Sequence, residues 1–219
     1  MTNRSRSARR APAFTLLEAA LTLVIIGVGV LAMVDAQQAF IQSNLWSSHA
    51  ATATYLAQEV REFSRNLPRH DPVLGLAPNE GGDEFAELFG AEVNENAIDD
   101  IDDIDDLDDV TFGAAGDFQG PISALGEIIP EIAIDGSTET DEEGNVLPMT
   151  GWSQQVTVEK VEPFDSSVSR PDDYGREEEV DGLPPLARDE FPLRVTVTVV
   201  YTPNVGEPIE MAVVTWIVP

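Results

Sequence analysis

The sequence predicts an α+β fold in which one long N-terminal helix packs on a small antiparallel sheet. Three observations carry this prediction. Residues 14–34 form an apolar run with a single carboxylate, apolar residues then recur at steps of three and four through residue 67, and the chain from residue 151 onward alternates with a period of two. A period near 3.6 indicates a helix, whereas a period of two indicates strands with one buried face.

The first segment joins a basic leader to an apolar run that is long enough to cross a membrane. Residues 1–13 contain four arginines, and residues 14–34, at about 1.5 Å per helical residue, span a hydrocarbon core of about 30 Å. By the positive-inside rule the arginines keep the N-terminus in the cytoplasm. We therefore expect a single-pass protein of the inner (cytoplasmic) membrane whose C-terminal head lies outside the cytoplasm. A carboxylate such as Glu18 costs about 2.5–3.5 kcal/mol at the bilayer centre, so it needs a partner.

The run Phe14-Thr15-Leu16-Leu17-Glu18, after an arginine-rich leader, resembles the type IV prepilin signal of pilins and type II secretion pseudopilins. The resemblance implies that a membrane prepilin peptidase cleaves between Ala13 and Phe14 and methylates the new amine of Phe14. It also implies that Glu18 pairs with the terminal amine of a neighbouring subunit during assembly. Opposite charges buried on adjacent helices stabilise each other, whereas either alone is costly. The family usually has Gly before the cleavage, where this chain has Ala13.

The same resemblance extends to the head and implies further partners. The helical run Ala50–Asn66 and the strand that opens at Gly151 look like those of PilV-type minor pilins and their pseudopilin counterparts. The implied function is that of a minor pilin or pseudopilin in a type IV pilus-like or type II secretion filament, extracellular or periplasmic. Its implied partners are the peptidase, other pilin or pseudopilin subunits, the membrane and, indirectly, an assembly platform and its ATPase.

Two other interpretations of the N-terminus stay open. The first is a secretory signal peptide cleaved after Ala36. The second is a plain signal anchor that happens to contain a glutamate. In that case the protein would be a membrane-anchored acidic binding module, which captures cations or a basic partner without filament assembly.

Composition shifts divide the chain into five segments. They are a basic leader (1–13), a transmembrane helix (14–34), its amphipathic continuation (35–67), a loop-rich acidic region (68–150) and the antiparallel sheet of the head (151–219). Pro68 ends the helix because proline lacks an N–H. Strands are expected at 152–159, 193–201 and 209–218, with a further one at 128–134, and residues 164–190 are expected to form a loop. The amphipathic helix at 40–67 is the expected cover of one sheet face.

Residues 98–110 repeat an apolar residue at every third position, with paired aspartates between them. This period fits neither an α-helix nor a strand, and neighbouring carboxylates repel one another, so a solvated loop is expected. The sharper hypothesis is a Ca²⁺ site, because Ca²⁺ takes six to eight oxygen ligands, although the Gly and Glu spacing of an EF-hand is absent. The candidate ligands are Asp99, Asp100, Asp102, Asp103, Asp105 and Asp106.

Charge and composition exclude several classes of function. The chain has 40 acidic and 12 basic residues, a net charge of −28, and no cysteine. Nucleic-acid binding through a basic surface is not expected, and disulfides, thiolate metal sites and cysteine nucleophiles are impossible. The only histidines, His49 and His70, lie in no catalytic or metal-binding motif. We therefore expect no enzymatic activity, since the chemistry at Phe14 belongs to the peptidase.

Overall fold

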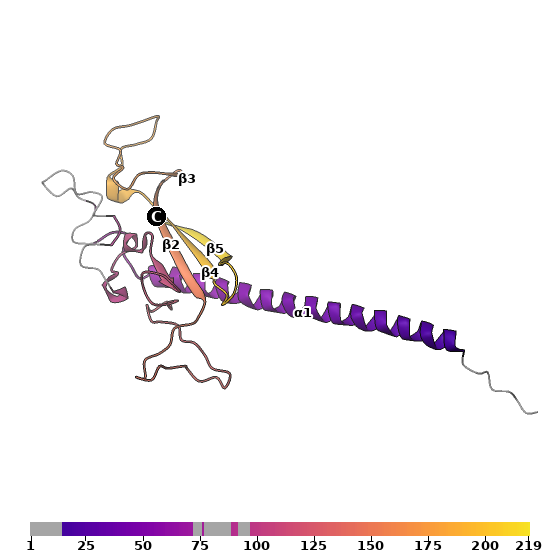
Figure 1. Cartoon of the computed structure of the whole chain (residues 1–219). Helices are drawn as coiled ribbons and strands as arrows, with labels where there is room; N and C mark the ends of the chain where they lie inside the picture. The colour runs from indigo at the N-terminus through magenta and orange to yellow at the C-terminus, as the bar shows by residue number, and fades with distance from the viewer. Residues whose placement is uncertain (1–14, 72–75, 77–88, 92–96) are drawn as a thin grey trace, which may run out of the picture. The chain divides into compact units, whose positions relative to one another are not determined.

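The computed structural model describes residues 15–71, 76, 89–91 and 97–219, and the chain divides into two compact units, residues 1–48 and 49–219. Helix α1, Leu16–Ser64, contributes to both units, and the strands belong to the second (Figure 1). The predicted α+β class is confirmed, with a long apolar N-terminal helix and an antiparallel sheet on which its C-terminal part packs.

In the first unit, α1 is an exposed apolar helix. It begins directly after Thr15, whose Oγ1 accepts a hydrogen bond from the N–H of Glu18 at 3.3 Å. Threonine before the first helical residue satisfies an N–H that would otherwise have no partner within the helix. The large apolar side chains from Leu16 to Trp46 are each 42–88 % exposed. This helix is long and apolar enough to cross a membrane, a property that it shares with signal sequences.

In the second unit, four strands form an antiparallel path in the order β1-β2-β4-β5, and β3 pairs with the end of β2. Figure 1 shows β2, β4 and β5 side by side. Their bounds are Thr111–Gly113 for β1, Trp152–Glu162 for β2, Asp165–Ser169 for β3, Leu193–Tyr201 for β4 and Ile209–Val218 for β5. The three main predicted strands are thus confirmed. The expected strand at 128–134 is wrong, because this segment forms only isolated bridges.

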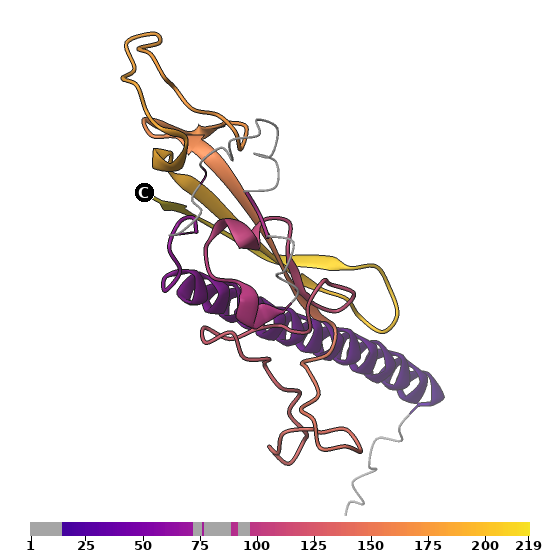
Figure 2. The ribbon, with the colours of Figure 1, turned by 90° about the vertical axis from the view of Figure 1, so that its left-hand side faces the viewer.

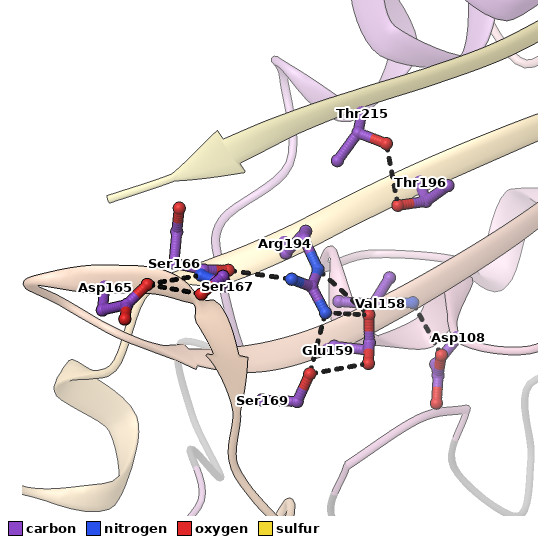
Figure 3. A network of polar contacts seen from close by, with 10 residues as sticks. All are labelled: Asp108, Val158, Glu159, Asp165, Ser166, Ser167, Ser169, Arg194, Thr196 and Thr215. Atoms are coloured by element: carbon purple, nitrogen blue, oxygen red, sulfur yellow. Dashed lines mark hydrogen bonds and ion pairs between the residues drawn. The ribbon is translucent and has the colours of Figure 1, made fainter.

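Neither β1 nor β3 was predicted from the sequence, and each case has a physical reason. β1 has three residues, too few to show an alternation, and all five residues of β3 are exposed, so no buried face marks it. The expectation that residues 164–190 form only a loop is therefore wrong at β3. Arg194 of β4 holds this strand in place: its guanidinium donates to Glu159 Oε2 of β2 at 2.7 Å, to Ser169 Oγ at 2.8 Å and to the carbonyl of Ser166 at 2.8 Å (Figure 3).

One stripe of α1 covers the inner face of the sheet. The stripe consists of Ala53, Leu56, Ala57 and Val60, all fully buried. It packs in one cluster with the inward side chains of β2 and β4, which are Trp152, Val156, Val158, Leu193, Val195, Val197 and Val199. These side chains alternate along both strands, and the register sets Val156 opposite Val197, so the predicted alternation of the strands is confirmed.

The helical cover is shorter than the expected 40–67. Ile41 and Leu45 are each 56 % exposed, and the α-helix ends at Ser64, followed by single turns to Leu67. Within the second unit, residues 49–219, the fully buried positions of α1 begin at Ala53.

A buried amide joins the helix, the sheet and the segment that follows β1. Gln154 of β2 is fully buried. Its Nε2 donates to the carbonyls of Leu56 (2.8 Å) and Ile122 (3.1 Å), and its Oε1 accepts from the N–H of Ile122 (2.8 Å). Both donor hydrogens and the acceptor of this amide are thus used inside the core, where an unmade hydrogen bond is costly.

Replacing Gln154 with Leu should therefore destabilise the head strongly. The variant leaves the N–H of Ile122 without its acceptor, and buried unsatisfied groups cost about 1–3 kcal/mol each, so we expect a loss of roughly 2–4 kcal/mol. At about 2–4 °C per kcal/mol, the Tm of the full-length protein in detergent should fall by about 5–15 °C. The matched control is Gln155→Leu, at an exposed neighbouring position. An equal fall in both variants would contradict this account.

Candidate functional site

The acidic repeat at 98–110 is an ordered part of the core. Ile101, Ile104, Leu107 and Val110 are all buried, in or beside two single 3₁₀ turns at Ile98–Asp100 and Asp105–Leu107. A 3₁₀ helix has three residues per turn, so a period of three can place every apolar residue on one side. The expected solvated loop is therefore wrong for residues 101–110: burial of the apolar positions offsets the repulsion between aspartates.

Several aspartates of the repeat are buried because they bond its own backbone. Asp103 Oδ1 accepts from the N–H groups of Asp105 (2.9 Å) and Asp106 (3.2 Å). Asp106 Oδ2 accepts in turn from the N–H groups of Asp102 (3.0 Å) and Asp103 (3.1 Å). Aspartate has the short side chain that can reach backbone N–H groups two to four residues away. These two carboxylates therefore stabilise the turn formed by residues 102–106.

The fold also gathers three of these carboxylates into a cluster that could hold a metal ion. Asp102, Asp103 and Asp106 each offer one oxygen, and the three oxygens lie within 4.8 Å of one another. In the described part of the chain, this is the one group of His, Asp or Glu residues with that geometry. The other predicted ligands, Asp99, Asp100 and Asp105, lie outside the cluster.

Asp105 instead bonds a histidine that sequence reasoning placed in a loop. His70 Nδ1 and Asp105 Oδ1 share a hydrogen bond of 2.8 Å, and both side chains are buried. Burial lowers the pKa of His70 to about 4, so the ring is neutral at pH 7 and the contact is not an ion pair. No sequence signal could reveal this contact, because the two residues are 35 positions apart and each is common in loops.

Burial makes the charged forms of these aspartates unfavourable. Removal from water, followed by the hydrogen bond and charge of Asp105, raises the pKa of Asp103 to about 9. Removal from water and the charge of Asp106 raise the pKa of Asp105 to about 7. At neutral pH Asp103 therefore favours a bound proton and Asp105 is about half protonated, whereas a bound cation would favour the ionised forms.

The repeat also completes the edge of β2. Asp108 Oδ1 accepts from the N–H of Val158 at 2.7 Å (Figure 3). This bond lies just beyond the point where the carbonyl of Val110 accepts from the N–H of Val156. A side chain thus continues the hydrogen bonding that the short β1 begins. The sequence did not predict a role for Asp108, because nothing in the sequence distinguishes it from the other aspartates of the repeat.

The predicted assembly residue lies at the start of α1. Glu18 is in the first helical turn, at the positive end of the helix dipole. The predicted cleavage residues, Ala13 and Phe14, lie outside the described residues. The ring of His49 packs against the rings of Tyr201 and Trp152, and the centroid distances are 4.5 and 5.6 Å.

Comparison of the chain with protein-family models, with curated proteins and with solved structures finds no match. The likeness to pilins consequently rests on the N-terminal residues and on the architecture. A long apolar N-terminal helix packed on an antiparallel sheet is consistent with a pilin-like fold.

The raised pKa values predict that the metal-free head loses stability as the pH rises from 6.5 to 8. Asp103 and Asp105 have folded pKa values of about 9 and about 7 against 3.8 ordinarily, so the folded state holds more protons here. His70 opposes this trend only between about 4 and 6.5, and Lys160, with its pKa lowered by burial to about 8, only above that value. Thermal melts in EDTA should show Tm falling across this window.

The Asp103→Asn variant keeps the acceptor oxygen but cannot ionise, so its Tm should depend less on pH between 6.5 and 8. The matched control is Asp135→Asn, because Asp135 is exposed and its pKa is lowered by hydrogen bonds from Ser137. That control should show the same fall of Tm with pH as the unmodified protein. If Asp103→Asn left this fall unchanged, the raised pKa of Asp103 would not be its cause.

Proposed function

We propose that this chain is a structural subunit, a minor pilin or pseudopilin. It is cleaved by prepilin peptidase before Phe14 and assembles into a type IV pilus-like or type II secretion filament. The observation that carries the proposal is the length of exposed apolar surface on α1. About 20 residues cross the hydrocarbon core, which takes the span from Leu16 to about Asp35, whereas exposed apolar side chains continue to Trp46.

The apolar residues beyond that span favour packing against other helices. Phe40, Ile41, Leu45 and Trp46 are each 56–67 % exposed on α1. A plain membrane anchor does not need large apolar side chains outside the bilayer, and contiguous exposed apolar surface is typical of a binding surface. Neighbouring subunits whose helices lie alongside α1 would bury both its membrane part and this extension.

Glu18 supports the same proposal on energetic grounds. Its place in the first turn after Thr15 gives it a local role, since a carboxylate at a helix N-terminus stabilises the helix by about 0.3–1 kcal/mol. The opposing cost of a carboxylate in lipid reaches about 2.5–3.5 kcal/mol at the bilayer centre and is smaller near the interface, where the first turn of the span lies. A cation would offset this cost, and the terminal amine of an adjacent processed subunit would supply it.

The proposed location follows from the same features. Before assembly the chain lies in the inner (cytoplasmic) membrane through α1, with its N-terminus in the cytoplasm and the sheet outside. After assembly it lies in a periplasmic or extracellular filament. The alternatives are a membrane-anchored acidic binding module and a secreted domain cleaved after Ala36. In neither does Glu18 have a partner.

Replacing Glu18 with Ala should abolish incorporation into filaments while leaving the protein in the membrane, because insertion does not require the carboxylate. The measurement compares the amounts of the variant in membranes and in sheared filaments. Asp35→Ala is the matched control, since Asp35 is the next acidic residue of α1. Normal incorporation of Glu18→Ala would count against a role in assembly.

The carboxylate cluster favours a second proposal, that Ca²⁺ binds the head at Asp102, Asp103 and Asp106. Three carboxylates supply three to six oxygens, and Ca²⁺ accepts backbone carbonyls and water for the rest. Two of these residues are buried, so a divalent cation would relieve the cost of their ionised forms. In this proposal Ca²⁺ stabilises the head and takes no part in catalysis.

Millimolar Ca²⁺ should raise the Tm of the head at pH 8. A ligand at about 100 times its Kd stabilises by about 2.7 kcal/mol, or roughly 5–10 °C for a chain of this size. Asp102→Asn should reduce the shift, whereas Asp99→Asn, exposed and outside the cluster, should keep it. An unchanged Tm with Ca²⁺ would contradict the proposal.

A further inference from the structure

Residues 121–150 form an arm that leaves the sheet between β1 and β2, and both views show it projecting away from β4 and β5 (Figures 1 and 2). It contains three turns with the same pattern of hydrogen bonds. In each, an N–H bonds the carbonyl four residues later at 2.8–2.9 Å, and a glycine with positive φ precedes that carbonyl. The bonded pairs are Ser123–Glu127, Ala133–Ser137 and Asp141–Asn145, with Gly126, Gly136 and Gly144.

A ring of backbone hydrogen bonds holds the centre of the arm. The N–H of Glu131 donates to Leu147 (2.8 Å), that of Leu147 to Glu139 (3.0 Å), and that of Glu139 to Glu131 (2.9 Å). Three extended segments, eight residues apart in sequence, are thereby each joined to the other two. Backbone bonds order the arm here, so its apolar side chains are not needed for a core of its own.

Several large apolar side chains of the arm are exposed on this ordered support. They range from 37 % exposed for Leu147 to full exposure for Ile134, and the set is Leu125, Ile132, Ile134, Val146 and Leu147. The bridge between Pro130 and Pro148 sets Val146 and Leu147 beside the segment that carries Ile132. The segments that carry Ile132 and Val146 thus lie side by side, while Leu125 and Ile134 are exposed at two of the turns, and exposed apolar side chains on an ordered support are typical of an interaction surface.

The charge of the arm decides what can bind it. Residues 121–150 carry Glu127, Glu131, Asp135, Glu139, Asp141, Glu142 and Glu143, and neither lysine nor arginine. The arm of a second copy and an anionic membrane would both be repelled by this charge. We propose that the arm is a docking surface for a protein partner that presents an apolar strip flanked by Lys and Arg side chains.

This inference goes beyond the proposed filament and does not depend on it. The test measures binding of a 12-residue peptide of alternating Leu and Lys to the full-length chain in phosphatidylcholine nanodiscs, with empty nanodiscs as background. Neutralising the arm with Glu139→Gln, Glu142→Gln and Glu143→Gln should weaken binding about fivefold or more. The matched control neutralises Glu177, Glu178 and Glu179, three exposed carboxylates in the segment between β3 and β4, and should change binding less than about twofold.

A second pair of variants tests the apolar part. Leu125→Ser with Ile134→Ser should weaken binding as the arm neutralisation does, whereas Phe164→Ser with Val205→Ser, also exposed but outside the arm, should not. These side chains are exposed, so an unchanged Tm will show that the variants fold. Equal weakening by both charge variants, no effect of Leu125→Ser with Ile134→Ser, or a dimer of the chain that the arm variants abolish would each overturn the proposal.

Discussion

The second unit depends on the contact between one stripe of α1 and the inner face of the sheet. Ala53 and Leu56 bring the helix close to β2 and β4, and Gln154 adds hydrogen bonds that only this spacing permits. The amide also fixes Ile122, a buried residue at the start of the arm, so helix, sheet and arm share one buried polar contact. A shift of the helix along the sheet would break the hydrogen bond with Leu56, which makes the register of the whole unit specific.

The acidic repeat shows how a strongly charged segment becomes part of a core. Burial of Leu107 and its apolar neighbours stabilises the fold. The aspartates that are buried with them accept hydrogen bonds from backbone N–H groups, which offsets the cost of their burial. Asp108 completes the edge of β2, so the repeat also protects a sheet edge that would otherwise be open. Burial raises the pKa of Asp103 and of Asp105, so the stability of the head depends on pH.

Two of the exposed apolar surfaces in the described part of the chain differ in their chemistry. The exposed helix from Leu16 to Trp46 is almost free of charge, which suits lipid or the helices of other subunits. The arm at 121–150 mixes apolar side chains with carboxylates, which suits a basic protein surface and not lipid. The partners proposed for the helix and for the arm would therefore differ, because neither surface has the chemistry that suits the partner proposed for the other.

The sequence by itself determined the α+β class, the long apolar helix and the three main strands, since each has a period that burial on one side imposes. It could not determine where the buried part of the helix begins, because Ile41 and Ala53 belong to the same apolar stripe, yet Ile41 is exposed and Ala53 is buried. It also could not distinguish the aspartates of the repeat. Only the tertiary structure buried Asp103 and paired Asp105 with His70, because those environments come from contacts between distant parts of the chain.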